Sequence, residues 1–184
     1  MLNRPLSAAI LGCLLPLFCL ACSDEDAPDT LIVTSPAFGD GQVIPARHTC
    51  AGAGESPALF IANPPPGTQS FALRLEGPTT QSARETLWLI WGIPAGSGAL
   101  PHGVQSQEYD VPPFQQGRAD NELVGYQPPC APTRDYAEYR FTAFALDAVD
   151  IPGLGHPADR ATFDRSMQSH VLATGTLTGR SRRR

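Results

Sequence analysis

Short apolar runs that end at proline or glycine constrain this chain to a fold built mainly of β-strands. The 19 prolines and 17 glycines are spread along the 184 residues instead of being pooled in one segment. Proline removes a backbone donor and glycine favours turns, so neither residue suits the interior of a long helix. Six runs have the composition of strands, at residues 31–34, 59–62, 70–76, 87–93, 139–146 and 171–177. This order of short strands and turns predicts a two-sheet antiparallel β-sandwich.

Two of these runs predict different degrees of burial. Phe71, Leu73 and Leu75 alternate with other residues in the run at 70–76, which indicates a strand with one apolar face. The run at 87–93 is apolar on both faces, as in a central strand that is covered on both sides. The sequence therefore predicts a half-buried strand at 70–76 and a fully buried one at 87–93.

One helix is expected near the C-terminus, between the last two strands. Pro157 suits the first helical position, and Phe163 and Met167 lie four residues apart, on one helical face. Residues 96–117 are rich in turn residues, and their few apolar side chains are scattered, so they are expected to form loops. The expected fold is thus mainly β with a C-terminal helical segment.

The N-terminus has the pattern of an export signal. Arg4 supplies a positive charge, and residues 8–21 are nearly all apolar, a stretch too short to span a membrane comfortably. A small residue precedes Cys22, and an acidic, proline-containing segment follows it. This arrangement resembles a lipobox, at which bacteria attach diacylglycerol to a cysteine and cleave before it. Residues 1–21 are therefore expected to be a signal peptide, and residues 22–30 a lipidated cysteine with an acidic spacer.

Two departures leave plain secretion open as an alternative to lipidation. Cys19 stands where leucine is usual in a lipobox, and Leu20 stands where a smaller residue is usual. With either route the mature chain lies outside the cytoplasm. We expect a membrane-anchored lipoprotein of the bacterial cell envelope, with its domain in the periplasm or outside. If the host has two membranes, Ser23 after the cysteine, in place of an aspartate, favours sorting to the outer membrane.

The cysteine count agrees with export. Two cysteines leave with the signal and Cys22 carries the lipid, so the mature domain keeps Cys50 and Cys130. A pair of cysteines in an oxidising compartment forms a disulfide by default. The alternative is a metal site with His48, but two thiols and one histidine do not have a recognisable zinc spacing.

No catalytic or nucleotide-binding motif stands out. The chain lacks G-x-S-x-G, H-E-x-x-H, a P-loop, G-x-G-x-x-G and C-x-x-C. Its four histidines are far apart in sequence, and each is more typical of a surface or packed side chain than of a catalytic base. The net charge of -5 disfavours nucleic acid as a partner. We therefore expect no catalytic residue, no cofactor and no metal.

Several segments, in the same order along the chain, resemble the phosphatidylethanolamine-binding protein family and its bacterial Raf kinase inhibitor-like branch. They are Ser35-Pro36-Ala37-Phe38, Thr49-Cys50-Ala51-Gly52, Ser56-Pro57-Ala58-Leu59, Trp88-Leu89-Ile90-Trp91-Gly92-Ile93-Pro94, Gly125-Tyr126, Tyr139-Arg140-Phe141 and His170-Val171-Leu172-Ala173. The resemblance covers residues 31–179, which we take as the domain. It implies a two-sheet sandwich and places Cys50 and Cys130 on neighbouring loops near a ligand pocket, which supports the disulfide.

The pocket is where the chain departs from the family pattern. The family holds an anion with an Asp-Asp-Pro-Asp stretch, a histidine before the central-strand tryptophan and a His-Arg pair. Here those positions are Glu76-Gly77-Pro78-Thr79, Leu87 and Ala137-Glu138. Without the imidazole donors, and with the Glu138 carboxylate nearby, phosphate is expected to bind with millimolar affinity at best. The residues expected to line this degenerate pocket are Glu76, Pro78, Thr79, Leu87, Pro132 and Tyr139.

These departures leave the pocket either vestigial, which we favour, or adapted to a less anionic ligand. Returning acids to positions 77 and 79 and histidines to positions 87 and 137 is expected to recover phosphate binding if the backbone has kept its shape. The function expected from the sequence is non-catalytic binding of a ligand or a protein at the cell envelope. The alternatives are inhibition of a secreted protease through a surface loop and, less favoured, an unrecognised hydrolase.

The last five residues, 180–184, contain four arginines and are expected to form a mobile basic tail. The tail is either solvated, which we favour, or docked on anionic lipid headgroups, where each arginine would add about 1 kcal/mol of binding energy. The expected partners are thus the membrane, through the lipid anchor, and an unidentified small ligand or protein.

Overall fold

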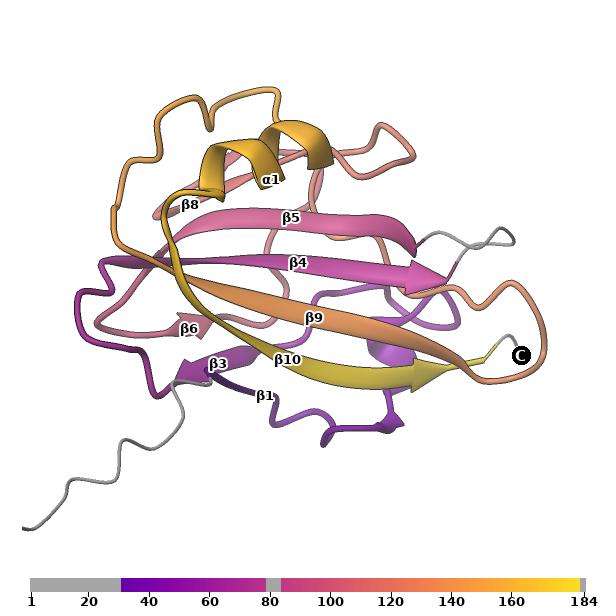
Figure 1. Cartoon of the computed structure of the whole chain (residues 1–184). Helices are drawn as coiled ribbons and strands as arrows, with labels where there is room; N and C mark the ends of the chain where they lie inside the picture. The colour runs from indigo at the N-terminus through magenta and orange to yellow at the C-terminus, as the bar shows by residue number, and fades with distance from the viewer. Residues whose placement is uncertain (1–30, 79–83, 183–184) are drawn as a thin grey trace, which may run out of the picture.

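The computed structural model describes residues 31–78 and 84–182, and Figure 1 shows long strands packed against shorter ones, with one helix on the outside. The strands are β1 (Ile32–Thr34), β2 (Gln42–Val43), β3 (Leu59–Ala62), β4 (Ser70–Pro78), β5 (Arg84–Pro94), β6 (Ala99–Leu100), β7 (Asp110–Val111), β8 (Phe114–Gln116), β9 (Ala137–Leu146) and β10 (Val171–Ser181). A 3-10 helix, η1 (Ala46–His48), and an α-helix, α1 (Arg160–Met167), complete the elements. The predicted fold class, mainly β with two sheets and a C-terminal helix, is confirmed.

The larger sheet contains seven strands in the order β2-β10-β9-β4-β5-β8-β7, and the smaller sheet contains three in the order β1-β3-β6. Every strand pair is antiparallel except β2 with β10, which is parallel. The four long strands β4, β5, β9 and β10 lie side by side, and they form the platform that positions the site (Figure 1).

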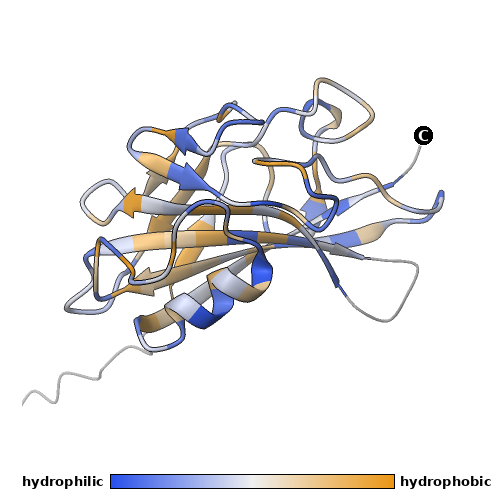
Figure 2. Ribbon diagram, turned by 90° about the horizontal axis from the view of Figure 1, so that it is seen from above, coloured by the Kyte–Doolittle hydropathy of each residue, from blue (hydrophilic) through white to orange (hydrophobic). Residues whose placement is uncertain are grey.

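Apolar side chains fill a layer on each face of the larger sheet. Between the two sheets, the alternating apolar face of β4 packs with Trp88 of β5 and Phe141 of β9. On the opposite face, Leu89 packs with Phe163 and Met167 of α1. Figure 2 shows the hydrophobic colour running along the long strands, while α1 carries both hydrophilic and hydrophobic segments. Strand β4 is therefore buried on both faces, and not half-buried as the alternation indicated, because α1 covers its second face.

Helix α1 begins later than the sequence indicated. Asp159 caps it, and the Asp159 carboxylate accepts a hydrogen bond from the Thr162 backbone N–H at 2.8 Å. Pro157 lies before this cap and is not the first helical residue. Phe163 and Met167 are both buried, as their spacing predicted. In the part of the chain that the structure describes, no helix is long and apolar enough to cross a membrane.

Two further expectations about the extent of the elements are corrected. Strand β10 continues to Ser181, because it pairs with both β2 and β9, so the first two residues of the expected mobile tail lie in the sheet. The guanidinium of Arg182 then lies over the Tyr136 ring, 5.1 Å from its centroid. The expected loop at 96–117 contains the short strands β6, β7 and β8. The expected signal peptide, lipidated cysteine and spacer at 1–30, and the last two arginines, lie outside the described residues.

Candidate functional site

A cavity of about 270 Å³ lies at the end of the larger sheet where β4 ends and β5 and β9 begin. Its walls come from these three strands and from two loops, one before β3 and one before β9. The lining residues are Pro78, Glu85, Leu87 and Tyr139 on the strands and Cys50, Asn121, Gln127, Pro128 and Cys130 on the loops. The cavity thus combines apolar walls with one carboxylate, one phenol and two amides.

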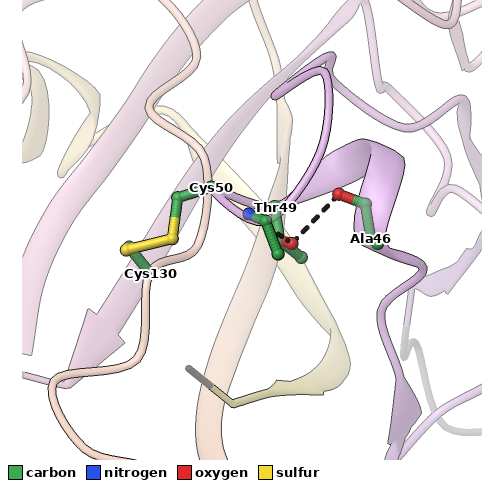
Figure 3. Close-up of a disulfide and its surroundings, with 5 residues drawn as sticks. Ala46, Thr49, Cys50 and Cys130 are labelled. Carbon is green, nitrogen blue, oxygen red and sulfur yellow. Dashed lines mark hydrogen bonds between the residues drawn. A yellow bond between two sulfur atoms is a disulfide. The ribbon is translucent and has the colours of Figure 1, made fainter. Parts of the chain in front are cut away.

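A disulfide between Cys50 and Cys130 joins the two loops that complete the cavity (Figure 3). The Cα atoms of the pair are 5.2 Å apart, and the Cys50 backbone N–H donates to the Pro129 carbonyl at 3.1 Å. The Thr49 hydroxyl donates to the carbonyl of Ala46 in η1 at 3.0 Å (Figure 3). The disulfide wall of the cavity is therefore anchored to η1 on one side and to the loop before β9 on the other.

Tyr139 supplies a buried hydroxyl to this cavity. The residue is 1% exposed, and its hydroxyl has no hydrogen-bond partner among the described residues. The backbone of Cys130 lies near the hydroxyl, but the two groups do not have the geometry of a hydrogen bond. Burial, with a smaller contribution from the Glu85 carboxylate, raises the pKa of Tyr139 to about 12. The side chain is therefore a neutral hydroxyl at physiological pH, and its capacity to form a hydrogen bond is unused by the described residues.

Glu85 is the one charged side chain among the described residues that line the cavity. Within the described part of the chain it makes no ion pair. Two side-chain amides lie on the same wall, where Asn121 Nδ2 donates a long hydrogen bond of 3.4 Å to Gln127 Oε1. The Gln127 backbone N–H donates to the Leu87 carbonyl at 2.9 Å, which fixes the loop to β5.

The structure brings together three of the six residues predicted for the pocket. Pro78, Leu87 and Tyr139 line the cavity. Pro132 does not, because the chain turns outward into solvent after the buried Ala131. Thr79 lies outside the described residues. The sixth predicted residue, Glu76, lies on the other face of β4, so its assignment to the pocket is wrong.

Glu76 belongs to an ion-pair network between β4 and α1. Its Oε1 lies 2.9 Å from Arg160 Nη2 on α1, and its Oε2 lies 3.4 Å from Arg74 Nε on β4. Arg74 also pairs with Asp164, which in turn lies 3.5 Å from Arg160 Nε. The guanidinium of Arg74 lies over the Phe144 ring at 5.4 Å. These contacts dock the helix on the sheet, which is a structural role.

Packing around Gly77 leaves no room for a side chain at this position. A Cβ atom at this position would lie 2.7 Å from Tyr139 Cε1 and 2.9 Å from Leu87 Cδ1. Carbon atoms pack at about 3.5–4.0 Å, so no side chain fits here unless these neighbours move. Replacing Leu87 with histidine would still leave the Tyr139 ring in place. The expectation that returned acids and histidines would recover phosphate binding does not fit this packing.

The carboxylate of the cavity is Glu85, and not Glu138 as the sequence comparison indicated. Glu138 lies on the opposite face of its strand and pairs with Arg84 Nη2 at 3.0 Å and Arg140 Nε at 3.1 Å. The sequence carried a signal for Glu85, since it lies two residues before Leu87 and side chains two apart share a face of a strand. The same alternation would have placed Glu76 opposite Leu75. Asn121 and Gln127, which come from an irregular loop, carried no such signal.

Two histidines that are distant in sequence do come together. The rings of His48 and His102 lie 5.6 Å apart, and His102 Nε2 is 2.9 Å from the Glu55 carboxylate. Burial lowers the pKa of His48, while Arg47 donates to Glu55 at 3.2 Å and lowers the pKa of that carboxyl. In the described part of the chain no hydroxyl or thiol bonds to either ring, and no three metal-ligating side chains converge. The cluster therefore contains no nucleophile–base pair.

Comparisons with known proteins agree with this geometry. The phosphatidylethanolamine-binding protein family matches residues 34–182. A "UPF0098 protein" of Archaeoglobus fulgidus is 30% identical over 160 residues, which cover 86% of this chain but only 54% of the archaeal protein. A second "UPF0098 protein", from Pyrococcus horikoshii, is 32% identical over 148 residues, which cover 79% of this chain and 73% of the relative.

Solved structures share the same fold. The crystal structure of Escherichia coli YbcL, described as a member of the mammalian phosphatidylethanolamine-binding protein family, superposes with a TM-score of 0.75. Its sequence is 26% identical, and the match covers 84% of this chain and 99% of YbcL. The sandwich, the cavity at the end of its larger sheet and the match over residues 34–182 lead to one assignment. The chain belongs to the phosphatidylethanolamine-binding protein family.

Proposed function

We propose that this family member is a non-catalytic binding protein of the Raf kinase inhibitor-like branch, exported and held at the cell envelope by a lipid on Cys22. Its cavity binds a ligand other than phosphate. The N-terminal pattern supports export and lipidation, and a disulfide on the mature domain suits an oxidising compartment.

One observation carries the proposal about the ligand. The described lining of the cavity contains no arginine, lysine or histidine, and it contains the Glu85 carboxylate instead. A phosphate oxygen that loses a charge-assisted donor forfeits about 1.5–3 kcal/mol. Loss of two such donors weakens phosphate binding about a hundredfold or more, and the carboxylate adds repulsion. The cavity therefore selects against anions.

Titration calorimetry of the purified chain tests this proposal, with inorganic phosphate and phosphorylethanolamine as the probes. Both are expected to bind with millimolar affinity at best. A Glu85→Gln variant is expected to bind them no more than about tenfold better, because removing the repulsion supplies no donor in place of the lost ones. Micromolar phosphate binding by the unmodified chain would overturn the proposal.

A further inference from the structure

The cavity has the chemistry of a cation site. We propose that it takes a small primary ammonium ion, with Glu85 as the opposite charge and the Tyr139 hydroxyl as the second polar contact. This inference rests on the proposed function, since it names the ligand class of the same cavity.

The charges around the cavity favour a cation. Side chains alternate along strands, so Glu85 and Leu87 face the cavity while Arg84 lies on the other side of β5. There Arg84 Nη2 pairs with Glu138 at 3.0 Å. Tyr139 stays neutral until its pKa of about 12, so the described lining carries one net negative charge at neutral pH. An ammonium ion supplies the positive charge that this lining lacks.

The hydrogen-bonding groups match the three N–H donors of a primary ammonium. A Glu85 carboxylate oxygen and the Tyr139 hydroxyl oxygen can each accept one donor. The hydroxyl is buried without a hydrogen-bond partner among the described residues, so a ligand that bonds to it removes a desolvation cost. The amide oxygen of Gln127, which accepts only the long bond from Asn121, can accept the third donor.

The walls and the volume limit the rest of the ligand. Pro78, Leu87, Pro128 and the disulfide give apolar surface for a short aliphatic chain. The volume of about 270 Å³ lies below the roughly 300–1,000 Å³ of cavities that enclose drug-sized molecules. The occupant is therefore a short alkylammonium group, either on a free amine or on the end of a lysine side chain.

Three probes of equal length separate charge from shape. Butylamine, butanol and butyrate are titrated into the full chain at neutral pH and followed by NMR, with the side-chain amide signals of Asn121 and Gln127 as local reporters. Butylamine is expected to bind at least tenfold more tightly than butanol, and butyrate is expected not to bind. Equal binding of butylamine and butanol, or no binding of butylamine, would overturn the inference.

Substitutions then assign the contacts. Glu85→Gln is expected to weaken butylamine binding about tenfold to a hundredfold, and Glu85→Asp to keep most of the affinity because the charge remains. Tyr139→Phe is expected to weaken it about threefold to tenfold. Glu108→Gln makes the same charge change at an exposed residue outside the cavity lining and should have no effect. Unchanged affinity in a folded Glu85→Gln variant would refute the role of the carboxylate.

The two sources of the ammonium group are distinguished by Nα-acetyl-lysinamide, which presents the same butylammonium arm on a peptide backbone. Tighter binding of butylamine indicates a free amine, and tighter binding of the lysine derivative indicates a lysine on a protein partner. Failure of this inference is separable from failure of the proposed function. If neither butylamine nor phosphate binds, only the inference falls, whereas micromolar phosphate binding overturns the proposed function itself.

Discussion

Replacing Glu76 with glutamine separates its structural role from a role in the cavity. The substitution keeps the shape of the side chain and removes the charge that Arg74 and Arg160 contact at 3.4 and 2.9 Å. We expect Glu76→Gln to lower the free energy of unfolding while leaving every ligand titration unchanged. Substitution of a residue that binds the ligand would instead change the ligand affinity and leave the free energy of unfolding nearly unchanged.

The magnitude follows from the burial of the network. Removing one partner from a buried ion pair costs about 3–5 kcal/mol. The Glu76 and Arg74 side chains are 8% and 15% exposed, but Arg74 keeps Asp164 and the Phe144 ring as partners. Arg160 is 37% exposed and can be hydrated. These compensations reduce the expected loss to about 2–3 kcal/mol, or about 4–12 °C in the midpoint of thermal unfolding for a domain of this size.

Urea and thermal unfolding under non-reducing conditions provide the assay. The matched control is Glu122→Gln, which breaks the pair with Arg118 at the surface, where the Glu122 side chain is 75% exposed. Surface pairs contribute about 0–1 kcal/mol, so this variant should unfold like the unmodified chain. A loss in Glu76→Gln no larger than that of the control would refute the reasoning, and a change in ligand affinity would return Glu76 to the site.

Three other predictions concern the anchor, the disulfide and the buried phenols. Cys22→Ser should move the protein from the membrane fraction to the soluble fraction, because it removes the attachment point of the proposed lipid anchor, and unchanged fractionation would contradict lipidation. The double variant Cys50→Ala, Cys130→Ala should lose up to about 4–5 kcal/mol of stability, since the bridge closes a loop across a sequence separation of 80 residues. Thiol labelling of the denatured, unreduced chain should find neither cysteine free. Burial raises the pKa of Tyr139 to about 12 and also raises that of Tyr126. Stability should therefore be complete below about pH 10, the pKa of an exposed tyrosine, and fall as pH rises towards 12, and Tyr139→Phe should lessen that fall in urea unfolding measured against pH.

Alternation along strands predicted the platform of the fold well, because it reports directly which side chains face a core. The two-faced apolar run at 87–93 marked the central strand β5 for this reason. Alternation also indicates the correct faces of Glu76 and Glu85, whereas the family pattern places Glu76 in the pocket. A position in a family motif identifies an equivalent backbone site, whereas the strand period indicates where a side chain inside the strand points; Pro78, the last residue of β4, lines the cavity although Glu76 does not.

Features that depend on distant contacts could not be predicted in this way. The alternation in β4 indicated one buried face and gave no sign that α1 covers the other. The reason is that α1 follows β4 by more than eighty residues in the sequence. The lining amides Asn121 and Gln127 lie on a loop whose path is set by the disulfide and by its bond to β5. Loops of this kind follow their anchors and have no period of their own.

The filled space at Gly77 restricts the order in which this cavity can change its chemistry. An acid introduced there first would meet both the Leu87 methyl group and the Tyr139 ring, and the misfolded or destabilised product would offer no binding benefit. A smaller residue at position 87 removes one of the two obstacles, and it leaves space into which the Tyr139 ring can shift. Routes between an anion site and the present cavity therefore pass through Leu87 before they reach Gly77, and a library that randomises both positions should recover acids at 77 only together with small residues at 87.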